Sequence, residues 1–65
     1  MQVFINGKST VLAGPISVAV LLRQMKIEGK VAVEINHDII PRSRFEQQNV
    51  NEGDTLEIVH AIGGG

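Results

Sequence analysis

The N-terminal residues alternate between two faces, as expected of a half-buried strand. One face carries Val3 and Ile5, and the other carries Gln2, Phe4 and Asn6. This period of two predicts a strand over residues 2–6. Asn6 and Gly7 both tolerate positive φ, so the pair predicts a type I′ hairpin turn. A second strand is expected at residues 8–12, ending where Ala13-Gly14-Pro15 interrupts the pairing.

The pattern then changes to the period of an amphipathic helix. Ser17 is suited to the N-cap, because its hydroxyl can accept a hydrogen bond from the first turn. The apolar residues that follow at i, i+3, i+4 and i+7 are Val18, Leu21, Leu22 and Met25. This stripe predicts a helix whose apolar face is core. Gly29 is placed to end the helix in the left-handed conformation.

The second half of the chain predicts three further strands. Apolar side chains alternate with others over residues 31–35, and Ile39-Ile40 forms a short strand that Pro41 stops. Residues 42–45 predict one helical turn that plugs Phe45 into the edge of the core. Residues 51–54 form a turn before a last strand at residues 55–62.

The predicted order of elements is therefore β-β-α-β-β-β. A hairpin, a crossover helix and later strands place one main helix on one face of a mixed sheet. This is an α+β fold with the element order of the β-grasp (ubiquitin-like) architecture. We expect one domain at residues 1–62, followed by a flexible C-terminal glycine tail at residues 63–65.

Composition excludes several classes of function. The 65 residues include no cysteine, so a disulfide scaffold, a thiolate zinc site and a cysteine nucleophile are all ruled out. Six basic against seven acidic residues, with two phenylalanines as the aromatics, give no case for nucleic-acid binding. No apolar stretch approaches the length of a membrane span, and the N-terminus lacks the features of a signal peptide. We expect a soluble, cytoplasmic protein.

The chain ends on three glycines, Gly63, Gly64 and Gly65. No Cβ restricts this segment or blocks approach to its carboxylate, so it could thread into a narrow active site on another protein. There the carboxylate could be activated as an acyl-adenylate and attacked by a nucleophile. The alternative is an inert, frayed end or a cloning remnant. No nucleophile–base set and no metal site can be assembled from the sequence, so we do not expect an enzyme.

Several segments of the sequence resemble the ThiS family, the sulfur carriers of thiamine (thiazole) biosynthesis. The resemblance rests on Gln2-Val3-Phe4-Ile5-Asn6-Gly7, on Val33-Glu34-Ile35-Asn36, on Ile40-Pro41-Arg42 with Phe45 behind it, and on residues 53–65, GDTLEIVHAIGGG. The three-glycine ending departs from the two-glycine form and is interpreted as a length variant.

The resemblance implies a reaction cycle carried out by partners. An E1-like adenylating enzyme (ThiF type) would use ATP and magnesium to adenylate the carboxylate of Gly65. A sulfur donor protein would convert it to a thiocarboxylate, and thiazole synthase (ThiG type) would take the sulfur. The chain itself would bind no cofactor and no metal.

Three other functions share features with this one. The small subunit of molybdopterin synthase is also a sulfur carrier with a diglycine end. A β-grasp interaction module with an inert tail and a ubiquitin-like conjugated modifier are the other two. Incubation with an activating enzyme and ATP would distinguish the inert module from a sulfur carrier, because an inert tail would give no pyrophosphate release.

Docking residues can also be suggested. Strand parity places Phe4 and Val59 on the face opposite the core, where parallel neighbouring strands would join them into one apolar patch. Arg42 and Arg44 form either a small basic docking patch or two solvated charges. Ile62 and His60 adjoin the tail and could take part in docking, although a partly exposed strand histidine is the simpler interpretation of His60. His37, beside Asp38, is interpreted as a turn residue.

Overall fold

The structure is a computed structural model that describes residues 1–60. The predicted end of the last strand at residues 61–62, the docking candidate Ile62 and the tail residues 63–65 lie outside the described residues. The predicted boundary between domain and tail lies outside them too.

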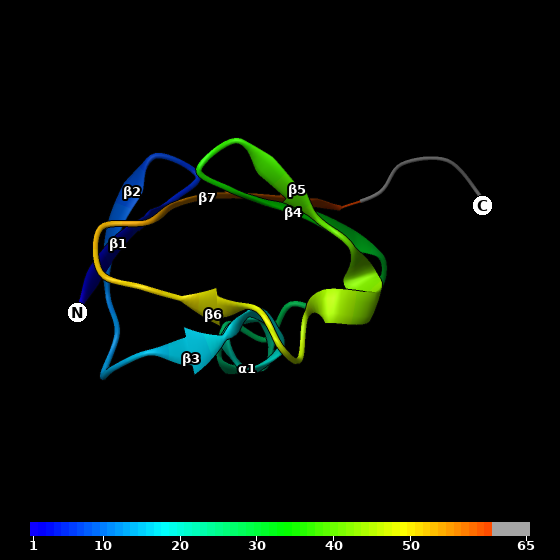
Figure 1. Ribbon diagram of the computed structural model, residues 1–65, viewed down its shortest axis with the longest axis horizontal. Helices are drawn as coiled ribbons and strands as arrows, with labels where there is room; N and C mark the ends of the chain where they lie inside the picture. The colour runs from blue at the N-terminus through cyan, green and yellow to red at the C-terminus, as the bar shows by residue number, and fades with distance from the viewer. Residues whose placement is uncertain (61–65) are drawn as a thin grey trace.

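One face of a five-stranded mixed sheet carries the helix (Figure 1). The strands are β1 (Gln2–Ile5), β2 (Lys8–Val11), β4 (Val31–Ile35), β5 (Asp38–Ile40) and β7 (Thr55–His60). They lie in the order β2-β1-β7-β4-β5, with β1 parallel to β7 and the other pairs antiparallel. The helix α1 (Val18–Gln24) packs beneath the sheet. The predicted α+β, β-grasp architecture is confirmed.

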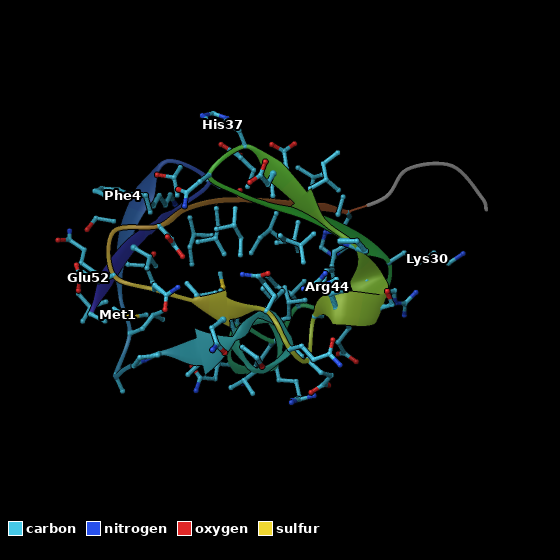
Figure 2. The ribbon with its side chains drawn as sticks, in the orientation of Figure 1. Met1, Phe4, Lys30, His37, Arg44 and Glu52 are labelled. Atoms are coloured by element: carbon cyan, nitrogen blue, oxygen red, sulfur yellow. The ribbon has the colours of Figure 1, made fainter. Side chains whose placement is uncertain are left out.

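The core fills the space between the sheet and the layer below it (Figure 2). Its buried residues are Val3, Ile5, Leu12, Val18, Leu21, Leu22, Val33, Ile35, Phe45, Val50, Leu56 and Ile58. Every second residue of the central strands contributes, which confirms the predicted strand parity. None of the helices within residues 1–60 is long and apolar enough to cross a membrane.

The first hairpin forms as predicted. Asn6 and Gly7 have φ values of 51° and 82°, the positive values that a type I′ turn requires. Beyond the end of β2, Leu12 donates its N–H to the carbonyl of Met1 at 2.7 Å, and the N-terminal ammonium donates to the carbonyl of Leu12 at 3.0 Å. The pairing therefore extends to residue 12, where we expected the strand to end.

The start of α1 also agrees with the prediction. The Ser17 hydroxyl accepts from the N–H of Val20 at 3.1 Å. The two preceding N–H groups have distant partners, which sequence alone did not indicate. Val18 donates to the Gln48 carbonyl at 2.8 Å, and Ala19 donates to that of Phe45 at 3.0 Å. The donors that a helix N-terminus leaves free are thus satisfied by the segment that follows η1 (Arg42–Arg44).

The end of α1 differs from the prediction. The helix ends at Gln24 with Met25 as its C-cap, and Lys26 takes the left-handed position with φ 58°. Gly29, which we expected to end the helix, has a positive φ but lies in the loop beyond it. Met25 is 41% exposed and is not part of the buried core.

A Schellman motif explains this earlier ending. Lys26 donates its N–H to the Arg23 carbonyl at 3.1 Å, and Ile27 donates to the Leu22 carbonyl at 2.9 Å. Ile27 is half-buried and packs against the core. Ile27 therefore packs on the core at this end of the helix, where we expected Met25 to do so.

Two short strands were not predicted. They are β3 (Ile16–Ser17) and β6 (Asn49–Val50), which pair antiparallel in a separate two-stranded sheet. Val50 of β6 is completely buried and belongs to the core. Beside them, the helical turn η1 brings Phe45 into the core, as predicted from its position after the two arginines.

Candidate functional site

β5 and β7 finish at the same end of the sheet. His60, the last described residue, lies opposite Val31 at the start of β4. Val33 lies opposite both Ile58 of β7 and Ile40 of β5, so η1, which begins at Arg42, follows β5 at this end of the sheet. His60, at the end of β7, and the start of η1 therefore lie at the same end of the sheet.

Three basic residues lie near this end of the sheet. Lys30 directly precedes β4, and Arg42 and Arg44 belong to η1. Figure 2 shows Lys30 and Arg44 at the end of the molecule opposite Met1 and Glu52. All three basic residues are exposed. The side chain of Arg42 is therefore accessible to a partner, and its docking role stays a prediction.

The two histidines have separate positions. His60 places its Nε2 atom 3.3 Å from the Glu28 carbonyl and so links the end of β7 to the loop after α1. His37 lies in the turn between β4 and β5 with φ 74°, which confirms the turn assignment. Within residues 1–60 no three His, Asp or Glu side chains are grouped so that they could hold a metal ion.

Two asparagine side chains hold β7 in place, and sequence reasoning missed both roles. The Asn6 amide donates to the Ile58 carbonyl at 3.0 Å and accepts from the Ile58 N–H at 2.7 Å. The Asn36 amide accepts from the Thr55 N–H and donates to the Asp54 carboxylate, both at 3.0 Å. Each asparagine follows a strand directly, which was the available signal in the sequence.

The face of the sheet opposite α1 is not covered by any described element. Strand register places these residues on it: Gln2, Phe4, Ser9, Val11, Ala32, Glu34, Ile39, Thr55, Glu57 and Val59. We call this the open face. Phe4 and Val59 are 42% and 57% exposed, so their predicted position away from the core is confirmed.

The single patch predicted for Phe4 and Val59 is wrong. Parallel pairing places Phe4 opposite Thr55, four residues before Val59. At 3.3 Å per residue the two side chains are about 13 Å apart along β7. Strand parity can assign a face, but only the register between β1 and β7 decides which residues on that face are neighbours.

Val59 instead borders a hollow on the open face. The hollow is lined by Ala32, Val33, Glu34, Ile39, Glu57 and Val59. Ile39 is 75% exposed, although it is a large aliphatic side chain. Exposed apolar groups gathered around a depression are typical of a surface that contacts another protein.

Comparison with known proteins identifies the family. The model of the ThiS family matches residues 3–65. The sulfur carrier protein ThiS of Escherichia coli is 32% identical, with each chain fully covered. The crystal structure of a thiamine biosynthesis protein (ThiS) from Geobacter metallireducens superimposes with a TM-score of 0.88 at 32% identity, again with both chains fully covered.

A longer relative is more similar in sequence. A thiazole synthase of Paramagnetospirillum magneticum is 44% identical over the whole of this chain, which spans only 20% of the length of that protein. The Escherichia coli and Geobacter proteins match over their full length, and the family model extends to the last glycine. The chain therefore belongs to the ThiS family, the sulfur carrier proteins of thiamine biosynthesis.

Proposed function

We propose that this chain carries sulfur as a thiocarboxylate on Gly65 and donates it to the formation of the thiazole of thiamine. The observation that carries the proposal is the family match, which includes residues 63–65 and so covers the three terminal glycines. The same match favours this function over the molybdopterin synthase subunit, the inert module and the conjugated modifier.

The proposed chemistry uses the terminal carboxylate alone. Its oxygen attacks the α-phosphorus of ATP on an E1-like adenylating enzyme (ThiF type), pyrophosphate leaves with the aid of magnesium, and an acyl-adenylate forms. Sulfide-level sulfur released by a donor protein then attacks the acyl carbon. The bond from that carbon to the AMP oxygen breaks, AMP departs, and the C-terminus is left as a thiocarboxylate. An acyl-adenylate is a far better electrophile than a carboxylate, and Gly64 and Gly65 leave its carbonyl carbon open to attack because neither has a Cβ.

Thiazole synthase (ThiG type) is the proposed recipient of the sulfur. Support comes from the Paramagnetospirillum relative, which is named a thiazole synthase and contains a region similar to this whole chain. Joining a carrier to the enzyme that consumes its sulfur raises the effective concentration of one for the other. In the present chain the same encounter would occur between separate molecules or within a larger polypeptide.

Docking is proposed to use two separate regions. Val59 and Ile62 would supply apolar contact close to the C-terminal glycines, with Arg42 near the same end of the sheet. Phe4 would form a separate contact on the open face, since the register sets it apart from Val59.

Removal of Gly64 and Gly65 tests the reactive role of the C-terminus. The shortened protein should unfold at the temperature of the full chain and show no ATP–pyrophosphate exchange with the activating enzyme. Gly65→Ala is the milder variant and should slow exchange, because a methyl group crowds the carboxyl carbon. Normal exchange by the shortened protein would refute the proposal, whereas intact-mass analysis showing oxygen replaced by sulfur at the C-terminus would support it.

A further inference from the structure

Two glutamates face each other at the centre of the open face. Glu34 of β4 lies directly opposite Glu57 of β7. Side chains opposite each other on neighbouring strands have Cβ atoms about 4.5–5.5 Å apart, and like charges in this position destabilise a sheet. Pairing Glu34 with Glu57 therefore opposes folding.

No basic side chain on the same face relieves this repulsion. The open-face positions of the described strands contain neither lysine nor arginine nor histidine. The one ion pair among residues 1–60 joins Arg23 of α1 to Glu46 at 3.3 Å, on the other side of the molecule. The two carboxylates thus form a negative site without a positive partner within residues 1–60.

Apolar side chains surround the glutamate pair. Ile39 lies opposite Glu34 on its other side, and Val59 lies two residues beyond Glu57 on the same face. Both aliphatic side chains line the hollow together with the two glutamates. A long basic side chain would fit this combination, because its aliphatic stem can pack on Ile39 and Val59 while its charged end reaches both carboxylates.

We propose that this hollow docks an arginine or lysine side chain on the surface of the partner thiazole synthase. The inference rests on the proposed function for the identity of that partner, and on charge complementarity for the chemistry of the contact. The relative that combines a region like this chain with a thiazole synthase favours that enzyme over the activating enzyme as the occupant. The partner cation would turn a repulsive pair in the free carrier into an attractive site in the complex.

The test compares the wild-type chain with Glu34→Gln, Glu57→Gln and the double variant. Binding to purified thiazole synthase encoded in the same genome is measured by calorimetry at low and high salt. The double variant should bind at least about tenfold more weakly at low salt, with a smaller difference at high salt, because the lost attraction is electrostatic. Its melting temperature should equal or exceed that of the wild type, since the repulsion is removed.

Glu46→Gln is the matched control, because it removes one negative charge from the α1 side of the molecule. It should leave synthase affinity within about twofold, as expected for an exposed charge outside the contact. Unchanged affinity in the double variant, or an equal loss in the control, would overturn the docking proposal. An equal loss of affinity for the activating enzyme would overturn the choice of synthase as the occupant. A wild-type chain that supports no pyrophosphate exchange would instead refute the proposed function, together with the inference that rests on it.

Discussion

Replacing Asn6 tests whether a single side chain holds β7 against β1. After β1 ends at Ile5, the side-chain amide of Asn6 continues the pairing with β7. It donates to the carbonyl of Ile58 and accepts from the N–H of the same residue. Asn6 also occupies the left-handed region with φ 51°, which asparagine tolerates better than alanine. Asn6→Ala therefore removes two hydrogen bonds and introduces backbone strain.

The expected loss of stability can be worked out from these two effects. Two net hydrogen bonds contribute about 1–3 kcal/mol, and left-handed strain adds about 1–2 kcal/mol. The sum is a loss of about 2–5 kcal/mol. This is a large part of the free energy of unfolding expected for a 65-residue domain, which is roughly 3–10 kcal/mol. The melting temperature should fall by at least roughly 10 °C. Asn6→Gly should lose less, because glycine accepts positive φ without strain and forfeits only the amide.

Urea unfolding followed by far-UV circular dichroism is the suitable assay, since the chain contains no tryptophan or tyrosine. Hydrogen exchange at the Ile58 amide gives a local measurement of the same contact. Asn51→Ala is the control, because the backbone and not the side chain of Asn51 bonds Asp54. A cost below about 0.5 kcal/mol for Asn6→Ala, no larger than that of a typical surface change, would refute the reasoning.

Two further predictions concern α1. Lys26→Gly should raise the free energy of unfolding by about 1 kcal/mol, because Lys26 has φ 58° at the left-handed position of the Schellman motif and glycine adopts that conformation without strain. Lower stability of this variant in urea unfolding would contradict the prediction and would show that the Lys26 side chain makes a compensating contact. Leu21→Ala should cost about 2–5 kcal/mol because Leu21 is fully buried, whereas Met25→Ala should cost under about 1 kcal/mol. If thermal unfolding showed equal losses of stability for the two variants, Met25 would have to be counted as a core residue.

Local features of the fold followed from the sequence because neighbouring residues determine them. Positive φ at Asn6 and Gly7 depends on their own side chains, and the Ser17 cap needs only the N–H three residues on. Alternation assigned Phe4 and Val59 to the face away from the core, because a strand repeats every two residues. The element order then limited the topology to one helix over a mixed sheet.

The tertiary structure decided everything that depends on register or on distant partners. Pairing of β1 with β7 separates Phe4 from Val59, and pairing of β4 with β7 brings Glu34 beside Glu57, 23 positions away in the chain. At the end of α1, Ile27 packs against the core and the Lys26 and Ile27 N–H groups bond the Arg23 and Leu22 carbonyls, so the helix stops before Gly29. Periodicity shows which side of a strand is apolar, but it does not show how two strands align. Long-range pairing sets that register, and moving one strand along its neighbour changes which residues are in contact on the face of the sheet.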